Sequence, residues 1–157
     1  MTSDVLKGTI KVLLVEDHPM FRERLAAVIS RRRDMTVCGE ADNANDALAL
    51  VEKTRPQIAI VDLVLSRSNG LDLLKGLKAR GIEIPSLVLS MHDETLYAER
   101  ALRAGARGYV TKYEASSEVT VAIDNILKGK IYLSRHMSER MVTLVQSAKT
   151  MAKSTLI

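Results

Sequence analysis

Short runs of apolar residues alternate along the chain with stretches in which apolar residues recur every three or four positions. Short runs rich in Val, Ile and Leu predict β-strands, and the helical spacing predicts amphipathic helices. The five predicted strands are Ile10–Val15, Met35–Glu40, Gln57–Val61, Ser86–Ser90 and Arg107–Thr111. The pattern therefore predicts five strand–helix units in strict alternation.

The spacing also predicts which helical residues face the core. In chain order they are Phe21, Leu25, Val28 and Ile29; Ala44, Ala47, Leu48 and Val51; Leu71, Leu74 and Leu77, with Lys78 as a polar boundary; Tyr97, Ala101 and Ala104; and Val119, Ala122, Ile123, Ile126 and Leu127. Gly81 and Gly105 are predicted C-caps, and Asn43 and either Ser68 or Asn69 are predicted N-caps.

Five alternating units imply a parallel sheet with helices on both faces, because parallel strands need crossover connections. Strands that are covered on both faces are continuous apolar runs, as in Val12–Val15 and Ile58–Val61. The expected fold class is therefore α/β, a doubly wound (βα)5 sheet.

The pattern changes near Lys130. A short extended or turn-like segment is followed by a helix in which Met137, Met141, Leu144, Ala148 and Met151 lie 4, 3, 4 and 3 residues apart. About two heptads are fewer than the three or four typical of a coiled coil. An appended helix that covers part of the domain is favoured, and a dimerisation helix stays open. We expect one domain over residues 8–130 and a linker with a C-terminal helix over 131–157.

Composition and charge narrow the class of protein. The chain of 157 residues, 46% hydrophobic and 27% charged, suits one soluble domain with an appendage. It has neither a signal-peptide pattern at its start nor a stretch of roughly 20 apolar residues, so we expect a cytoplasmic protein without a membrane partner. The single cysteine, Cys38, fits a reducing compartment. The net charge of +4 is spread along the chain and does not by itself predict nucleic-acid binding.

Polar residues that could bind a ligand or take part in a reaction lie at the ends of four of the predicted strands. Open α/β sheets bind ligands beyond the carboxyl ends of their strands. Glu16 and Asp17 follow the first strand, Asp62 the third, Ser90 ends the fourth, and Lys112 follows the fifth. Each residue alone has an ordinary explanation as a helix cap or a solvated side chain. Their shared position predicts a site.

The combination suits phosphoryl transfer. Carboxylates on neighbouring strands, about 5 Å apart, can share one cation, and Mg²⁺ prefers a few carboxylates, waters and a phosphate oxygen. Lys112 and Ser90 would hold the other phosphate oxygens. A carboxylate such as that of Asp62 can act as the nucleophile and form an acyl phosphate.

Four segments, in this order, resemble the receiver domains of two-component response regulators. They are Val12–Pro19, Val61–Leu65 together with Asn69–Leu71, Val88–Ser90, and Ala104–Lys112. The resemblance covers about residues 10–129. It implies the flavodoxin-like strand order 2-1-3-4-5.

The resemblance also implies a role for each site residue. Asp62 would be the phosphoacceptor, and Mg²⁺ would be held by Asp17 and Asp62 directly, by Glu16 through water, and by the backbone carbonyl of Val64. Ser90 would be the switch hydroxyl, Tyr109 the switch aromatic that turns inward when Ser90 moves, and Lys112 the phosphate-binding lysine. Without the family context, Tyr109 reads as a half-buried aromatic on an edge strand.

Three positions need comment. His18 belongs to the family's loop pattern and is interpreted as structural. The family commonly has Pro where this chain has Ser66, and often has Pro in a cis peptide where this chain has Tyr113. A cis bond without Pro would cost about 3–4 kcal/mol, which leaves the isomer of this bond open.

Residues 124–134 are similar to the receiver-to-effector junction of NarL/FixJ-type transcription regulators. In those proteins a helix-turn-helix domain follows, whereas 23 residues remain here after Ser134. We expect the receiver portion of such a regulator or a stand-alone version, with DNA as a partner only if a helix-turn-helix domain exists beyond this chain.

The resemblance implies a signalling switch that takes a phosphoryl group from a sensor histidine kinase, not an enzyme. Its readout surface, formed by the fourth helix, fifth strand and fifth helix, would serve dimerisation or partner binding and transcription control. One alternative is a Mg²⁺-dependent phosphatase with an aspartyl-phosphate intermediate; against it, Val64 stands where such enzymes have a second Asp. The other is an adaptor domain that is never phosphorylated, which the complete set of site residues disfavours.

Overall fold

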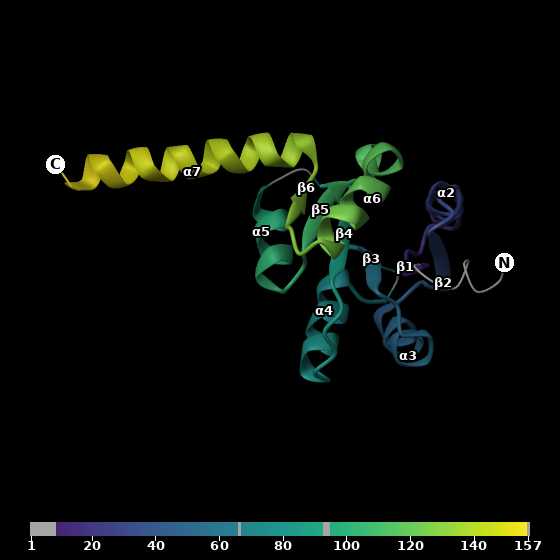
Figure 1. The fold of residues 1–157 in the computed structure, drawn as a ribbon. Helices are drawn as coiled ribbons and strands as arrows, with labels where there is room; N and C mark the ends of the chain where they lie inside the picture. The colour runs from purple at the N-terminus through teal and green to yellow at the C-terminus, as the bar shows by residue number, and fades with distance from the viewer. Residues whose placement is uncertain (1–8, 66, 93–94, 157) are drawn as a thin grey trace.

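The computed structural model describes residues 9–65, 67–92 and 95–156, and the side chains up to residue 149 within these ranges. Its elements are, in chain order, β1 (Ile10–Val15), α2 (Pro19–Ser30), β2 (Met35–Ala41), α3 (Ala44–Thr54), β3 (Ile58–Asp62), α4 (Gly70–Ala79), β4 (Ser86–Ser90), α5 (Thr95–Arg103), β5 (Gly108–Thr111), α6 (Lys112–Leu127), β6 (Tyr132–Leu133) and α7 (Arg135–Leu156). The five predicted strands are present, with ends that differ by at most one residue (Figure 1).

One parallel sheet in the order β2-β1-β3-β4-β5-β6 forms the centre of the domain. This confirms the α/β class and the order 2-1-3-4-5. The short strand β6 is an addition: Tyr132 and Leu133 pair with Gly108 and Tyr109. The reading of Tyr109 as a half-buried residue on an edge strand is therefore wrong, because β5 lies between β4 and β6 and Tyr109 is fully buried.

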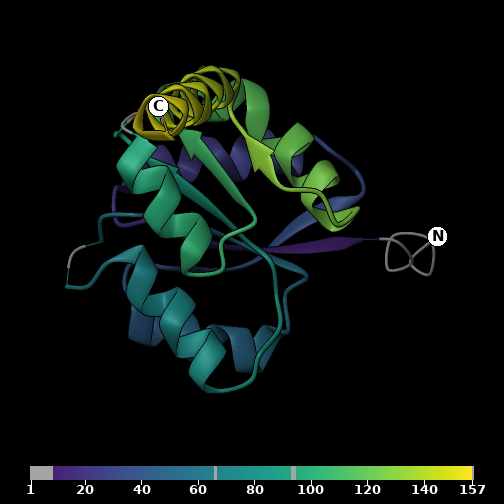
Figure 2. The same cartoon turned by 90° about the vertical axis from the view of Figure 1, so that its left-hand side faces the viewer.

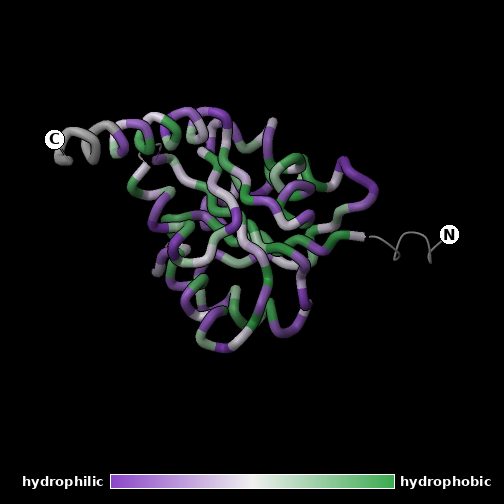
Figure 3. Tube along the Cα trace, turned by 60° about the vertical axis from the view of Figure 1, so that its left-hand side comes forward, coloured by the Kyte–Doolittle hydropathy of each residue, from purple (hydrophilic) through white to green (hydrophobic). Residues whose placement is uncertain are grey.

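Helices cover both faces of the sheet (Figure 2). Successive residues of a strand point to opposite faces, so Val12 and Leu14 pack with α2 and α6, whereas Leu13 and Val15 pack with α3 and α4. Figure 3 shows the hydrophobic segments concentrated in the centre of the domain. Full burial of each such side chain contributes about 1.5–3 kcal/mol.

The helix ends agree with the predicted caps. Asn43 accepts a hydrogen bond from Asp46 N, and Asn69 forms a reciprocal capping box with Asp72. Ser68, the other candidate cap of α4, accepts a hydrogen bond from Ala44 N of α3 through its hydroxyl. Gly81 and Gly105 have positive φ angles of 67° and 107°, in the region that favours glycine at a helix end.

Some predicted core positions are less buried than expected; among them, Phe21, Val28 and Tyr97 are only partly buried and pack against the core. In α4, Leu73 is buried, and Leu71 is only partly buried but packs against the core. Ala104 is also only partly buried, since it lies just beyond the last turn of α5. Leu127 is 37% exposed, because it is the last residue of α6 and lies where the helix leaves the sheet.

Helix α7 starts beside β6 and extends away from the domain (Figure 1). Met137 is completely buried, but Leu144 is 42% exposed and Ala148 is also exposed. Met151 lies outside the residues whose side chains are described. The appended helix thus covers the domain with its first turns alone. Among the described residues, no helix is long and apolar enough to cross a membrane.

Candidate functional site

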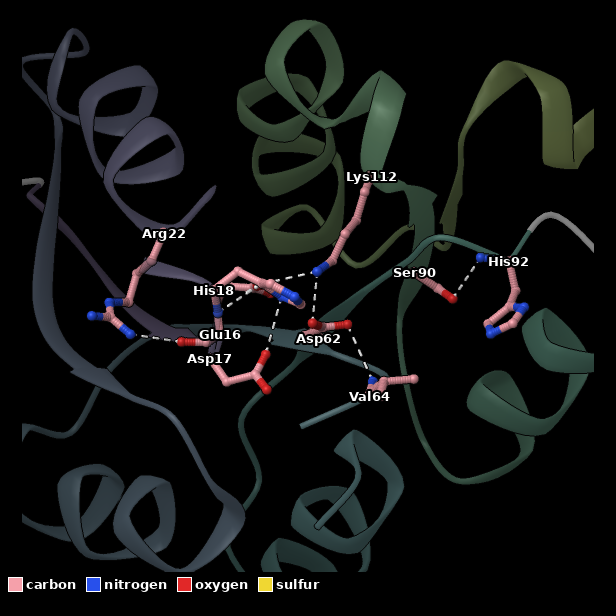
Figure 4. Close-up of polar contacts among 9 residues, drawn as sticks. All are labelled: Glu16, Asp17, His18, Arg22, Asp62, Val64, Ser90, His92 and Lys112. Carbon is pink, nitrogen blue, oxygen red and sulfur yellow. Dashed lines mark hydrogen bonds and ion pairs between the residues drawn. The ribbon is translucent and has the colours of Figure 1, made fainter. Parts of the chain in front are cut away.

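The carboxyl ends of the central strands bring the predicted residues to one edge of the sheet (Figure 4). Glu16 and Asp17 come directly after β1, Asp62 and Ser90 end β3 and β4, and Lys112 begins α6. Parallel register places these ends side by side: Val15 pairs with Val61, and Asp62 pairs with Leu89. The same register pairs Ser90 with Thr111.

Lys112 joins the two buried carboxylates. Its Nζ lies 2.9 Å from Glu16 Oε1 and 2.7 Å from Asp62 Oδ2. All three side chains are almost completely buried. The same ammonium lies 4.8 Å from the centre of the Phe21 ring, which adds a cation–π contact. The sequence pattern had placed Phe21 in the core and did not indicate this contact.

The centre holds two acidic groups and one basic group in a buried setting. Burial, together with the hydrogen bond and the charge of Glu16, raises the pKa of Asp62 to about 6, although Lys112 opposes the change. Burial disfavours the charged form of Lys112, but hydrogen bonds to Asp62 and Glu16 outweigh it and raise the pKa of the ammonium. A further positive charge in this site would stabilise the ionised form of Asp62.

The donor atoms fit a hard divalent cation. Glu16, Asp17, His18 and Asp62 each place one possible ligand atom within 4.8 Å of the others. Glu16 Oε2 is buried and, within the described part of the chain, has no hydrogen-bond partner. Oxygen-rich sites of this kind suit Mg²⁺. Residues Glu16, Asp17 and Asp62 could hold it.

Two further residues support the acidic loop after β1. His18 Nδ1 lies 3.0 Å from Glu16 Oε1 and 3.2 Å from Asp17 Oδ1, at the exposed rim of the site. Arg22 donates a hydrogen bond of 2.9 Å from Nη1 to the backbone oxygen of Glu16. The adjacency of His18 to Asp17 was a signal for the first contact, but no pattern indicated that Arg22 would reach back from α2.

The loop after β3 holds the other side of the Asp62 carboxylate. Asp62 Oδ1 accepts a hydrogen bond of 3.1 Å from Val64 N. Gly70, at the start of α4, lies so close that a Cβ there would be 2.5 Å from the backbone oxygen of Asp62. The carbonyl of Val64 remains a predicted cation ligand, and Ser66 lies outside the described residues.

Ser90 and Tyr109 meet at the backbone of His92. Ser90 Oγ accepts a hydrogen bond of 2.9 Å from His92 N, and the Tyr109 hydroxyl donates one of 2.7 Å to His92 O. The His92 ring stacks on Tyr97 of α5 at a centroid distance of 4.3 Å. The two predicted switch residues are thus linked through a residue that the sequence pattern did not single out.

Lys112 follows β5 without a break and starts α6. No peptide bond among the described residues is cis, so the bond between Lys112 and Tyr113 is trans. The arrangement as a whole offers a buried carboxylate that could act as a nucleophile, two more carboxylates for a cation and an ammonium that reaches the first carboxylate.

Comparison with known proteins gives a family match over the same segment. The model of the response regulator receiver domain matches residues 12–124. A Pseudomonas aeruginosa protein named as a transcriptional regulator is 39% identical over 123 residues, which are 78% of this chain and 58% of that protein.

Solved structures agree. A two-component response regulator of the LuxR family from Aurantimonas sp. SI85-9A1 is 32% identical, with a TM-score of 0.82 over 86% of this chain and 96% of that one. The isolated receiver domain of RcsB from Salmonella enterica serovar Typhimurium, determined with phosphomimetic BeF3⁻, shares the fold at 21% identity, with a TM-score of 0.76 over 83% of this chain and 97% of that one.

The match leaves part of each relative uncovered. The chain spans 58% to 66% of the length of the first curated relatives it matches. The family model, by contrast, covers most of this chain. The chain belongs to the response regulator receiver domain family.

Proposed function

We propose that this protein is a phosphoacceptor switch that receives a phosphoryl group on Asp62 from a sensor histidine kinase, with Mg²⁺ as cofactor. The observation that carries the proposal is the buried contact of Lys112 with both Glu16 and Asp62 at the carboxyl edge of the sheet. An ion pair that only stabilised the fold would not need a third carboxylate, that of Asp17, beside it. It would also not need a buried carboxylate oxygen without a hydrogen-bond partner, such as Glu16 Oε2.

The chemistry follows from the positions of these groups. The Asp62 carboxylate attacks the phosphorus of a phosphohistidine, so that an oxygen–phosphorus bond forms while the nitrogen–phosphorus bond breaks. Bound Mg²⁺ would supply positive charge for the phosphoryl oxygens. Lys112 is within reach of the Asp62 carboxylate and would hold a phosphoryl oxygen.

The remaining site residues act around this centre. Asp17 and Asp62 would bind Mg²⁺ directly, Glu16 would bind it through water, and the backbone carbonyl of Val64 would complete the protein ligands. Ser90 follows the phosphoryl group, and its link to Tyr109 through His92 carries the change to β5.

The output belongs to the face formed by α5, β5 and α6. We propose that this face, or α7, mediates dimerisation or partner binding, with residues 8–130 as the receiver domain and 131–157 as linker and helix. Transcription control is supported by the names of the relatives. DNA binding would require a helix-turn-helix domain beyond this chain. The protein would act in the cytoplasm as a signalling protein, assisting only its own phosphoryl transfer and hydrolysis.

Acetyl phosphate with Mg²⁺ tests the proposal without the kinase. The wild type should gain one phosphoryl group in intact-mass spectra, and Asp62→Asn should gain none. The matched control is Asp42→Asn, an exposed aspartate that follows the neighbouring strand β2 and should label like the wild type. Equal labelling of Asp62→Asn and the wild type would refute the assignment of the site.

A further inference from the structure

Two glutamates of α6, one helical turn apart, contact the start of the C-terminal segment. Glu118 Oε1 accepts a hydrogen bond of 2.6 Å from the hydroxyl of Tyr132. Glu114 Oε1 accepts one of 2.5 Å from Thr111 Oγ1. The backbone N–H groups of Arg135 and His136, at the start of α7, favour the ionised forms of Glu118 and Glu114, respectively. The two carboxylates thus lie near the start of α7, where the N–H groups of a helix have no intrahelical partner.

The pKa values of the two carboxyls are shifted in opposite directions. Burial disfavours ionisation of Glu114, but hydrogen bonds, first of all that of Thr111, outweigh it and lower the pKa of this carboxyl. Burial and the nearby Glu114 raise the pKa of Glu118. The N-terminus of a helix carries a partial positive charge, which attracts a carboxylate held against it.

The C-terminal segment is also fixed to β5. Tyr132 N donates to Arg107 O at 2.9 Å, and Ser134 N donates to Tyr109 O at 3.1 Å. Met137, completely buried, belongs to the same apolar cluster as Tyr109. A Cβ on Gly108 would lie 2.9 Å from Tyr132 O, so this glycine allows β6 to approach β5 closely.

Thr111, which contacts Glu114, is therefore one residue away from Lys112 of the proposed phosphoacceptor site. Thr111 pairs with Ser90 in the sheet and holds Glu114 through its hydroxyl. The next residue, Lys112, holds Glu16 and Asp62. Thr111 thus connects Glu114 with Lys112 through the backbone and with Ser90 through the sheet.

We propose that Glu114 and Glu118 form an intramolecular docking site for the first turn of α7, and that this docking couples the orientation of α7 to the state of the Asp62 site. The coupling rests on the proposed function, because it needs a phosphoryl group at Asp62; the docking does not. Past its first turns α7 carries the exposed side chains Val142, Leu144 and Val145, so the docking site controls where this apolar surface points. The two states of the switch differ in that direction.

Hydrogen exchange tests the docking in the unphosphorylated protein. In Glu114→Gln/Glu118→Gln, the amides of the first turn of α7 should exchange at least about tenfold faster than in the wild type, while those of β1 and β3 stay unchanged. The control, Glu99→Gln, removes an exposed carboxylate that pairs with Arg103 on α5, and should exchange like the wild type. Tyr132→Phe, which removes one hydroxyl, gives a milder second variant with the same expected direction. Wild-type exchange in both would overturn the docking site.

Spin labels test the coupling. Labels at Lys75→Cys on α4 and Ser147→Cys on α7, with Cys38→Ser, should show a shifted distance distribution when beryllofluoride and Mg²⁺ are added. The shift should be lost when Glu114→Gln and Glu118→Gln are added. If fluorine NMR shows bound beryllofluoride and the distribution does not shift, the coupling is overturned and the proposed function stands. If no beryllofluoride binds, the proposed function fails and the coupling with it, while hydrogen exchange still decides the docking.

Discussion

Lys112 is the residue on which the geometry of the site depends. Its ammonium is the single group in contact with both Glu16 and Asp62 among the contacts described, and it is held in place as the first residue of α6. Without the ammonium between them, the buried carboxylates of Glu16 and Asp62 would repel each other. The lysine is therefore a counter-ion to both carboxylates, and in the proposed function it also holds a phosphoryl oxygen.

Replacement of Lys112 by Ala should slow phosphorylation. The variant loses the positive charge that stabilises the transferred phosphoryl group, so labelling by acetyl phosphate should fall by about 10²–10³-fold. Initial rates from intact-mass spectra measure the effect. Lys128→Ala, an exposed lysine at the other end of the same helix, is the control and should label at the wild-type rate. A Lys112→Ala rate within twofold of the wild type would remove this lysine from the reaction.

Asp17 gives a separate test of the cation. Asp17→Asn removes one of the three carboxylates and should weaken Mg²⁺ binding at least about tenfold, which corresponds to about 1.4 kcal/mol. An NMR titration with Mg²⁺ that follows the amides after β1 and β3 measures the affinity. Asp42→Asn should titrate like the wild type, and unchanged affinity in Asp17→Asn would exclude Asp17 as a ligand.

The residues of the site were predictable where a strand end fixes them. Glu16, Asp17, Asp62 and Lys112 follow apolar runs directly, and parallel strands leave little freedom in where their ends lie. The contact through His92 was not predictable, because it uses backbone atoms of a loop whose course no periodic pattern describes.

At the scale of elements, the close approach of α4 to β3 positions Asp62, the proposed phosphoacceptor. Gly70 begins α4, and its N–H donates to Leu63 O at 2.9 Å, next to Asp62. A Cβ at Gly70 would lie nearest the backbone oxygen of Asp62, at 2.5 Å, and would also lie 3.0 Å from Val61 Cγ1. The absence of a Cβ is what lets the helix start so near the end of the strand.

Gly70→Ala should therefore both destabilise the fold and disturb the site. The shift of backbone that the methyl group requires should lower the free energy of unfolding by about 1–3 kcal/mol, as overpacking does. Urea unfolding measures the stability and acetyl phosphate labelling the activity, which should fall as well. Gly76→Ala on the same helix is the control, since its Cβ would meet only the mobile end of the Leu48 side chain. If Gly70→Ala and Gly76→Ala lost stability and labelling to the same extent, the proposed role of Gly70 would be contradicted.

The short strand β6 was not predictable from the pattern of apolar residues along the chain. Residues 131–134 read as extended or turn-like, but two paired residues are too few to give a periodic signal. Their place beside β5 depends on the absence of a side chain at Gly108 and on the anchoring of Met137, which are tertiary contacts.

At the scale of the whole molecule, the structure consists of a receiver domain and a helix that extends from it (Figure 1). The two share one apolar cluster, which contains residues of α4, β4, α5 and β5 and a single residue of α7, Met137. The fold class and strand order were predictable because alternation alone dictates them. The direction of α7 was not predictable. Its sequence was compatible with a helix that packs along the domain and with a dimerisation helix that packs through its heptad seam.

Met137→Ala should weaken the link between the helix and the domain. Loss of a fully buried methionine side chain typically costs 2–5 kcal/mol, and we expect about 2–3 kcal/mol here because α7 lies at the surface and can adjust. Chemical denaturation measures the loss. Val142→Ala, which changes an exposed side chain of the same helix, should change stability by less than about 0.5 kcal/mol. If Met137→Ala lowered the free energy of unfolding no more than Val142→Ala does, α7 would not be packed against the domain through Met137.

The most direct test of the central claim is to locate the phosphoryl group. After incubation with acetyl phosphate and Mg²⁺, borohydride reduces an aspartyl phosphate to homoserine, and peptide mass mapping identifies the position. The account predicts homoserine at position 62, and none when Mg²⁺ is omitted. Homoserine at another aspartate, or its absence in protein that remains folded, would contradict it.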